Sequence, residues 1–282
     1  MRSLLVVPAS NAKALLRTLS LKSDQIIIDL EDMVTPENKA EARANTKEFL
    51  EKSESFKKLS LRVNELGTAD AELDIELINS FNPIRISSIV LPKINSIDDV
   101  KYWARKLPSN MQLEVQIETA MGLVKAAKIA SHDQVSSLAF GPADFMGSVG
   151  IPSKGPGNPW PEVAGILEYP LFQMIIAAHA HGKLAYDGPY FQTADHLGLT
   201  KAAYKARALG ADGKWAIHPD QIYLCNEAFT PGEDEIADAH RIIEQYAQMQ
   251  GAANADGLVV DVATKRAAER LLERASFARD IT

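Results

Sequence analysis

The order of apolar and polar residues predicts strands that alternate with helices. Short apolar runs of strand length recur along the chain, and a stretch with helical spacing of apolar residues follows each of them. The expected strands are Ser3–Pro8, Gln25–Leu30, Leu59–Val63, Ile86–Leu91, Leu113–Ile117, Leu138–Phe140, Lys183–Tyr186 and Lys214–Ile217. The expected helices are Asn11–Ser20, Pro36–Leu50, Ala69–Phe81, Ser96–Leu107, Gly122–Ser131, Leu171–His181, Ala194–Leu209 and Gln221–Phe229.

Eight such units predict an α/β fold, a (β/α)8 TIM barrel with a C-terminal helical extension. We expect the catalytic barrel to cover residues 1–230 and a helical arm to cover residues 231–282. The arm is too small to fold alone, so it must pack on its own barrel or on a neighbouring subunit. An open doubly wound sheet is the alternative, but no glycine-rich phosphate loop follows the first strand.

The arm is expected to contain two helices, Asp234–Gln250 and Val262–Ala275, joined by the polar linker Gly251–Asp261. Within the barrel, Gly147–Pro161 is rich in glycine and proline and has no period, which predicts a long loop. Because this loop follows a strand end, it occupies the position where barrel enzymes carry binding loops.

Two carboxylates end consecutive strands of the predicted barrel. Glu118 follows Leu113–Ile117, and Asp144 follows Leu138–Phe140 after a short Gly-Pro-Ala segment. Parallel strands end on the same side of a barrel, so both side chains can face one pocket. Two oxygen ligands with room for water and substrate are typical of a magnesium site. The alternative is that Glu118 caps the next helix and Asp144 lies in a surface turn.

Composition narrows the classes of protein that fit. The chain has 282 residues, a formal net charge of −7 and no long run of one sign, which argues against a nucleic-acid partner. Its single cysteine, Cys225, excludes an internal disulfide. No segment approaches the ~20 apolar residues of a membrane span. We therefore expect no membrane contact and a cytoplasmic location.

Recognisable motifs are spread along nearly the whole chain. In order, the segments are RSLLVVP, IIIDLEDMVTPENKAEAR, LRVNELGT, IVLPK, VQIET, LAFGPADF, DGPY, ALGADGKWAIHPDQI and DGLVVDV. Together they resemble the motifs of one enzyme family, the HpcH/HpaI aldolase–citrate lyase family, which includes the citrate lyase β-subunit. The closest-looking members are the malyl-CoA and citramalyl-CoA lyases.

The resemblance implies an enzyme that depends on Mg²⁺ or Mn²⁺ and makes or breaks a carbon–carbon bond beside a CoA thioester. Its substrate would be a 3-hydroxyacyl-CoA such as citramalyl-CoA or malyl-CoA. The products would be acetyl-CoA and a 2-oxo acid, either pyruvate or glyoxylate. The resemblance further implies a homo-oligomer, a trimer or a hexamer built from two trimers.

The resemblance also assigns roles to individual residues. Glu118 and Asp144 match the metal ligands, and Arg62 matches an arginine that contacts the substrate. Asp261 matches a general acid/base that reaches into the neighbouring subunit's barrel. For Arg62 the alternative is a pair with the acids after the second strand. For Asp261 the alternative is a solvated acid in a polar linker.

The resemblance assigns supporting roles to further residues. Asp29, Glu31 and Asp32 match an acidic cluster that holds metal-bound water, and the alternative is a cap on the next helix. Lys13 and Arg17 match basic positions on the first helix that contact CoA phosphates. Asp187, at the end of the seventh strand, is assigned to substrate binding.

The sequence departs from the family pattern at two places and leaves other functions open. Ala9 follows the first Val-Pro where the family usually has glycine, and GLVVD replaces the usual GKMVD at the C-terminal acid. The alternatives are a CoA-independent pyruvate aldolase, a malyl-CoA thioesterase, and a citrate lyase β-subunit that acts on a citryl thioester only within a complex.

Overall fold

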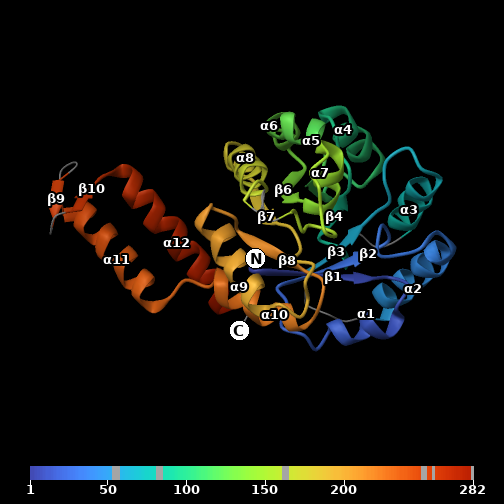
Figure 1. Ribbon diagram of the computed structural model, residues 1–282, viewed down its shortest axis with the longest axis horizontal. Coiled ribbons are helices and arrows are strands. Elements are labelled where there is room, and N and C mark those ends of the chain that lie inside the picture. Colours follow the sequence, from blue (N-terminus) through green and yellow to red (C-terminus); the bar gives the residue numbers. More distant parts are fainter. Residues whose placement is uncertain (53–57, 81–84, 161–164, 249–252, 256–257, 281–282) are drawn as a thin grey trace.

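Eight parallel strands close into a barrel in the order of the sequence, so the predicted (β/α)8 fold is confirmed and the open-sheet alternative is wrong (Figure 1). The computed structural model describes residues 1–282 except 53–57, 81–84, 161–164, 249–252, 256–257 and 281–282. The strands are β1 (Ser3–Pro8), β2 (Gln25–Asp29), β3 (Lys58–Arg62), β4 (Ser88–Leu91), β5 (Gln112–Ile117), β6 (Val135–Phe140), β7 (Leu184–Asp187) and β8 (Gly213–Ala216).

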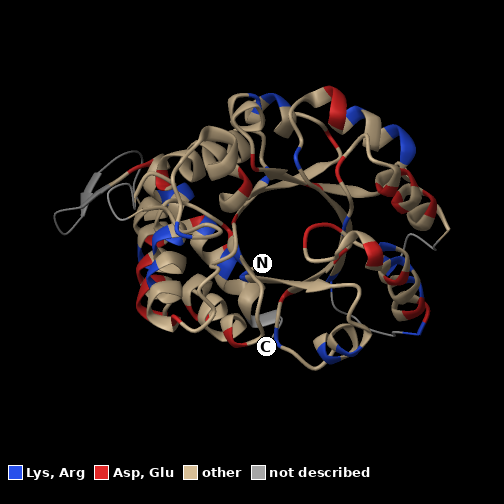
Figure 2. Ribbon diagram, turned by 45° about the vertical axis from the view of Figure 1, so that its right-hand side comes forward, with Lys and Arg blue, Asp and Glu red and all other residues tan. Residues whose placement is uncertain are grey.

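Helices surround this barrel and connect its strands, as the end-on view of the ring of strands shows (Figure 2). They are the 3-10 helix η1 (Pro36–Asn38) and the α-helices α1 (Ala12–Thr18), α2 (Lys39–Lys52), α3 (Ala69–Asn79), α4 (Ile97–Lys106), α5 (Ala120–Val124), α6 (Ala126–Ala130), α7 (Pro142–Val149), α8 (Glu168–His179), α9 (His196–Ala208) and α10 (Asp220–Phe229). Ser96 caps α4 and forms a capping box with Asp99.

Two predicted elements differ from the structure. The helix expected over Gly122–Ser131 is two short helices, α5 and α6, which meet at Lys125 with φ −102° and ψ 6°. The loop expected over Gly147–Pro161 begins later, because α7 runs to Val149. Pro142 starts α7 at a position that tolerates proline, and Gly150 ends it in the left-handed conformation.

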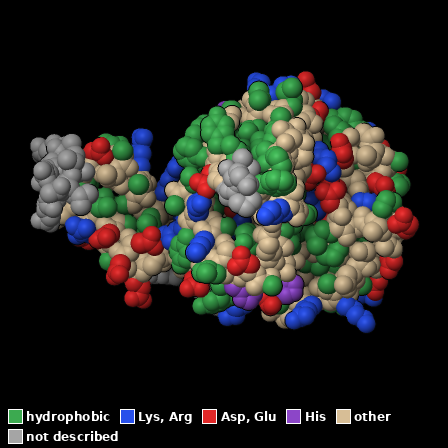
Figure 3. All heavy atoms as spheres, viewed as in Figure 1, with side chains coloured by type: hydrophobic (Ala, Val, Ile, Leu, Met, Phe, Trp, Pro, Cys, Tyr) green, Lys and Arg blue, Asp and Glu red, His purple; other side chains and the backbone are tan. Residues whose placement is uncertain are grey.

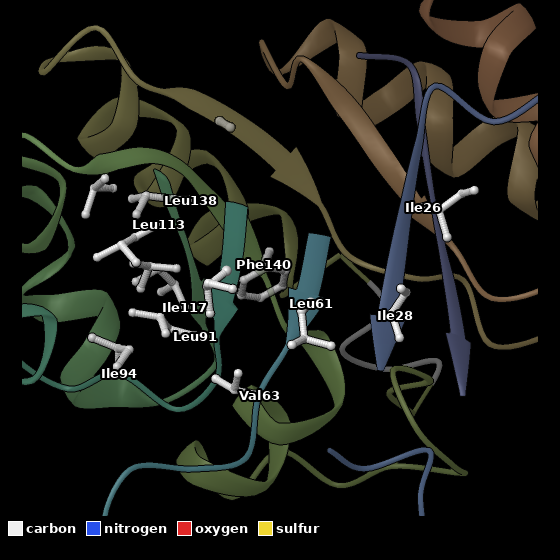
Figure 4. Close-up of a cluster of buried hydrophobic side chains, with 14 of the residues drawn as sticks. Ile26, Ile28, Leu61, Val63, Leu91, Ile94, Leu113, Ile117, Leu138 and Phe140 are labelled. Atoms are coloured by element: carbon white, nitrogen blue, oxygen red, sulfur yellow. The ribbon is translucent and has the colours of Figure 1, made fainter. Parts of the chain in front are cut away.

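Side chains along each strand alternate between the helices and the barrel interior. Figure 4 shows part of the outer layer, in which apolar side chains from successive strands pack toward the helices. A smaller apolar cluster lies in the interior and consists of Leu4, Val6, Ile27, Val90, Ala139, Tyr186 and Trp215. Because Ile27 points inward, Asp29 two residues later lies on the same face at the end of β2. The same alternation places Arg62 and Glu118 above the interior cluster.

The C-terminal segment forms an arm that extends away from the barrel (Figures 1 and 3). It contains α11 (Glu233–Gln248), β9 (Ala253–Ala255), β10 (Leu258–Val260) and α12 (Val262–Asp280). Within the predicted polar linker, β9 and β10 pair as an antiparallel two-stranded sheet. The end of α12 returns to the barrel, where Arg274 donates a hydrogen bond of 2.8 Å to Asp212.

One barrel helix carries apolar side chains on both of its faces. Leu171 and Met174 of α8 are buried against the barrel, whereas Tyr169, Phe172 and Ile176 on the opposite face are exposed. Figure 3 shows hydrophobic side chains gathered over this part of the surface.

In the described part of the chain, no helix is both long and apolar enough to cross a bilayer.

Candidate active site

A cavity of about 300 Å³ lies at the C-terminal ends of the strands, where barrel enzymes place their chemistry. Four of the predicted site residues line it, namely Asp32, Arg62, Glu118 and Asp144. Its other walls are mostly apolar and comprise Val6, Met33, Gly141, Pro142, Ala143, Pro156, Pro189, Phe191, Trp215 and Ile217, with Gln116 as a further polar residue. The barrel therefore brings the predicted metal ligands and the arginine into one largely apolar pocket.

The Glu118 carboxylate is buried and held by two hydrogen bonds. The backbone N–H of Lys93 donates to Oε1 at 2.7 Å, and the Gln116 side chain donates to Oε2 at 3.0 Å. In the described part of the chain, Lys93 is the one non-glycine residue with a positive φ, 51°. Such a conformation is uncommon for lysine and often marks a functional site. Here it turns the amide of Lys93 toward Glu118.

Gly141, at the end of β6, leaves the space that the Glu118 side chain fills. A Cβ atom at position 141 would lie 2.4 Å from Glu118 Oε2 and 2.5 Å from its Cβ. Neither distance is compatible with ordinary packing, and the backbone of β5 holds Glu118 in place. Only glycine at this position lets the carboxylate cross toward the next strand. The motif FGPAD therefore serves Glu118 as well as Asp144.

Asp144 lies in the first turn of α7, rather than in an irregular surface turn. Burial and the nearby charge of Asp32 raise its pKa above the ordinary range. Burial, followed by the charges of Glu31 and Asp144, raises the pKa of Glu118 to about 8. The raised pKa values show that placing two negative carboxylates in this pocket costs free energy. A cation bound between them would offset that cost.

The donor set fits a magnesium ion. Carboxylate oxygens are the ligands that Mg²⁺ prefers, and it usually keeps several water or substrate oxygens as well. Among the described residues, no group of three or more His, Cys, Asp or Glu side chains is placed to hold a metal. A metal held by Glu118 and Asp144 would therefore complete its coordination with water and substrate. This is the incomplete coordination that a catalytic site requires.

Arg62 joins the pocket to the acidic segment after β2. It donates two hydrogen bonds of 2.7 Å to Asp29, and its third nitrogen lies 3.1 Å from Glu31. Lys93 extends the network, with its ammonium 2.6 Å from Glu31 and 3.4 Å from Asp32. Burial lowers the pKa of Arg62, but Asp29 and Glu31 outweigh this and raise it, so the guanidinium stays charged.

The predicted acidic cluster divides into residues with different surroundings. Asp29 is fully buried, bonds Arg62 and accepts backbone N–H groups from Glu31 and Met33, but does not line the cavity. Asp32 is exposed and lines the cavity. Burial raises the pKa of Glu31 to about 7, although Arg62 opposes the shift. Arg62 therefore pairs with the acidic cluster, which was its alternative role, and it also lines the pocket.

A second cavity, of about 620 Å³, lies beside the first along α1. Val6, Met33 and Ile217 line both cavities, so the two adjoin. Lys13 and Arg17 line the second cavity and are exposed, one helical turn apart. The structure therefore places the predicted basic pair on one face beside the pocket of Glu118.

Asp187 does not share the pocket with the other predicted residues. It ends β7 on the outer face of the barrel, because its neighbour Tyr186 points into the interior. Its carboxylate pairs with the buried ammonium of Lys214, which also donates to the Gly188 carbonyl at 2.7 Å. The backbone N–H of Gly188 donates to Asp187 as well. These contacts support the end of β7, and Asp187 lines a separate cavity between α8 and α9. Its role in substrate binding stays a prediction.

Asp261 is also separated from the pocket within one chain. It precedes α12 at the tip of the arm, far from the strand ends of its own barrel (Figure 1). There it accepts a hydrogen bond of 2.9 Å from the backbone N–H of Thr264, as a helix N-cap does. If Asp261 acts in catalysis, it must do so in the pocket of another subunit.

Three residues in or next to the pocket were missed by the sequence reasoning. Lys93 holds Glu118 and Glu31, Gln116 orients Glu118, and the Trp215 ring lies beneath Arg62, with its centroid 5.8 Å from the guanidinium carbon. A signal existed for each of them. Lys93 and Gln116 lie within the matching segments IVLPK and VQIET, and Trp215 lies in the last strand, where alternate residues point inward.

The fold and the pocket define a class, a TIM-barrel enzyme whose paired carboxylates can hold a metal ion and whose buried arginine can bind a small oxygen-rich acid. Residues 2–219 match the HpcH/HpaI aldolase/citrate lyase family, and the chain belongs to this family of oxo-acid lyases. Its members include malyl-CoA lyases and CitE-like carbon–carbon lyases that act on CoA thioesters.

Similar proteins cover nearly the whole chain. An L-malyl-CoA/beta-methylmalyl-CoA lyase of Rhodobacter capsulatus is 32% identical over 285 residues, which cover 91% of this chain and 89% of the relative. A (3S)-malyl-CoA thioesterase of Cereibacter sphaeroides is 32% identical over 265 residues, covering 92% and 89%. The crystal structure of CitE from Mycobacterium tuberculosis with magnesium, acetoacetate and coenzyme A has a TM-score of 0.81 and 28% identity, with 98% of each chain covered.

Proposed function

We propose that the protein is a Mg²⁺-dependent lyase that cleaves a 3-hydroxyacyl-CoA, such as citramalyl-CoA or malyl-CoA, into acetyl-CoA and a 2-oxo acid. The observation that carries this proposal is the pocket in which Glu118 and Asp144 face Arg62, beside a cavity lined by Lys13 and Arg17. The similar CitE structure contains magnesium, coenzyme A and acetoacetate. Mn²⁺ offers the same oxygen chemistry and is a second candidate cofactor.

Glu118 and Asp144 would hold the metal, and neighbouring residues orient Glu118 for this role. Gln116 and the Lys93 amide fix the two oxygens of Glu118, so its carboxylate is oriented before substrate arrives. When bound, the metal supplies Lewis-acid stabilisation of the oxygen that becomes the ketone. The apolar walls around the carboxylates exclude water and strengthen this electrostatic effect.

Arg62 supplies the fixed positive charge of the pocket. Cleavage requires the substrate hydroxyl to give up its proton to solvent as it becomes the carbonyl of the 2-oxo acid. The bond between the hydroxyl carbon and the α-carbon of the thioester then breaks, and its electron pair moves toward the thioester as an enolate. A guanidinium that stays charged can stabilise that enolate or clamp the carboxylate of the 2-oxo acid. Asp29 and Glu31 hold Arg62 in one orientation, so little reorganisation is needed during the reaction.

The enolate must take a proton to leave as acetyl-CoA. Asp261 of a neighbouring copy is our candidate acid, and in the condensation direction the same carboxylate would remove the proton. Its place at the arm tip supports a homo-oligomer, a trimer or a pair of trimers, in which each arm reaches the next barrel. Lys13 and Arg17 are proposed to contact the phosphates of CoA.

Thioester hydrolysis at the same pocket is the second candidate, because one of the similar proteins is a (3S)-malyl-CoA thioesterase. The test offers a panel of acyl-CoA thioesters and free 2-oxo-acid aldols to the purified protein with Mg²⁺, with products identified by mass spectrometry. Acetyl-CoA with a 2-oxo acid supports the lyase, and free CoA with malate or citramalate supports the thioesterase. Turnover of free aldols alone, or turnover only after partner chains are added, would overturn the proposal.

A further inference from the structure

A third cavity, of about 400 Å³, lies behind the pocket that contains Glu118. It occupies the space between α8, α9 and the ends of β6 and β7. Its walls include the apolar side chains of Phe140, Leu167, Leu171, Ala202 and Leu209, and the paired Asp187 and Lys214 also line it. Lys201 and Lys205 also line it, and Lys205 is paired with Glu168 at 2.6 Å. We call this space the outer cavity.

The outer cavity and the pocket share part of one wall. Pro142 and Pro189 line both, so the two spaces are separated there by single side chains. Phe191 lines the pocket, and Gly157 lines the outer cavity. A Cβ atom on Gly157 would lie 2.7 Å from the Phe191 ring and 3.6 Å from Pro142. The ring therefore packs directly on the backbone of Gly157, at the boundary between the two spaces.

We propose that Phe191 determines the size of the 2-oxo acid that the pocket accepts. This inference rests on the proposed function, because it assumes that the 2-oxo acid binds beside Glu118 and Arg62. The proline rings at the boundary are fixed by their own backbone, whereas the Phe191 ring is a large side chain that a substitution can remove. With the ring in place, the acid must fit a space of about 300 Å³ that it shares with the acetyl group.

Removal of the ring would connect the pocket to the outer cavity. The apolar part of that cavity's wall suits an unbranched alkyl chain, which gains free energy from leaving water. Each methylene that a pocket admits or excludes changes selectivity by roughly tenfold to two-hundredfold. Phe191 would then restrict the enzyme to short 2-oxo acids, without itself contacting the bond that breaks.

The experiment compares the wild type with Phe191→Ala in the condensation of acetyl-CoA with unbranched 2-oxo acids of two to six carbons. Product acyl-CoA is measured by chromatography in the presence of Mg²⁺. The ratio of kcat/KM for the five-carbon acid to that for the shortest accepted acid is expected to rise at least tenfold. Phe191→Leu, which removes less volume, is expected to give a smaller increase.

Two further variants show whether a gain comes from the outer cavity. Ala202→Leu adds volume inside that cavity, so it should leave the ratio unchanged in the wild type and cancel the increase when combined with Phe191→Ala. Phe172→Ala removes a phenylalanine ring from the exposed face of α8, away from both spaces, and should leave the ratio unchanged.

The outcomes separate this inference from the proposed function. A wild type that condenses no 2-oxo acid with acetyl-CoA contradicts the proposed function. A wild type that is active, with an unchanged ratio in folded Phe191→Ala, contradicts the role of Phe191. A gain that survives Ala202→Leu also contradicts it, because the added space would lie elsewhere. If Phe191→Ala does not fold, the ratio in Phe191→Leu decides, and no increase there overturns the inference.

Discussion

Arg62 reaches Asp29 through two parallel hydrogen bonds, from Nε to Oδ1 and from Nη2 to Oδ2, each 2.7 Å long. The two residues end neighbouring strands, β2 and β3, and are partners in the register of the sheet. A planar guanidinium matches a carboxylate in this way, whereas an ammonium cannot form both bonds in the same geometry. The pair therefore fixes the direction in which the positive charge faces the pocket.

Replacement of Arg62 by lysine is expected to lower kcat/KM for the acyl-CoA substrate by about 10²–10³-fold, because the charge is kept but its position is lost. The measurement is steady-state cleavage, monitored as acetyl-CoA. Arg43→Lys is the matched control, since Arg43 pairs with Asp70 and Asp74 outside the pocket. Similar losses in both variants would show a general effect on the fold and contradict a specific role for Arg62.

Removal of either predicted metal ligand should weaken metal binding. We expect Glu118→Ala and Asp144→Ala each to raise the Kd for Mg²⁺ by at least about tenfold, because each provides a charged oxygen ligand in a site with few others. Titration calorimetry on the folded variants measures this directly. Glu76→Ala, on the exposed face of α3, is the control. Unchanged metal affinity in the Glu118 and Asp144 variants would remove the basis of the site.

Gly141→Ala should disturb the metal site although glycine has no side chain to bind a metal. Its Cβ would lie 2.4 Å from Glu118 Oε2, so the carboxylate must move. We expect weaker Mg²⁺ binding, by about tenfold or more, as for other groups that orient a ligand. Gly147→Ala in the same helix region meets no atom within 4 Å and should bind the metal normally. Equal affinities in the two variants would refute this role of Gly141.

The metal-free protein should lose stability as pH rises from about 4.5 to about 8. Burial raises the pKa of Glu118 from 4.5 to about 8, so across this window the folded state binds more protons than the unfolded state. The free energy of unfolding then falls with increasing pH, by an amount on the order of a few kcal/mol. Glu31, whose pKa is raised to about 7, acts in the same direction.

Thermal or urea unfolding in the presence of a chelator measures this dependence. Glu118→Gln should make the slope shallower, because the amide does not titrate. Glu76→Gln should leave the slope as it is, since that side chain is exposed. A wild type whose stability increases across the window would contradict the assigned surroundings of Glu118.

Two inactive variants should restore activity to each other if each pocket is completed by a second copy. Subunits of Asp261→Ala and Glu118→Ala are mixed after dissociation and then reassembled. In a ring with random mixing in equal amounts, about one quarter of the pockets contain both an intact Glu118 and an intact Asp261 from the next subunit. We therefore expect about one quarter of wild-type activity. No recovery, with subunit exchange proven by mass spectrometry, would mean that Asp261 does not act between chains.

The apolar pattern of the sequence was enough to predict the barrel. Each strand has an outer face under the helices and an inner face in the core, so its apolar run stands out from the polar segments that follow. The strand-end rule then located Glu118, Asp144 and Arg62, because every strand of such a barrel ends at the same rim. The pattern did not resolve the two short helices that meet at Lys125, since both carry the same apolar face.

The sequence could not decide which way a residue at a strand end points. Asp187 and Glu118 both end strands, yet Glu118 faces the pocket and Asp187 faces outward to Lys214. A shift of one residue reverses the direction of every side chain in a strand, and only the register of the closed sheet fixes it.

Contacts between distant segments were also settled only by the tertiary structure. The turn at Lys93 brings one residue to both Glu118 and Glu31, which follow the different strands β5 and β2. The contact between Phe191 and Gly157 likewise joins two loops, and no local sequence pattern predicts that these loops meet. The sequence by itself determined the fold and the kinds of groups at the barrel rim, because these follow from local periodicity and strand order. Which of those groups meet was decided by the closure of the barrel, since closure alone sets the distances between strand ends.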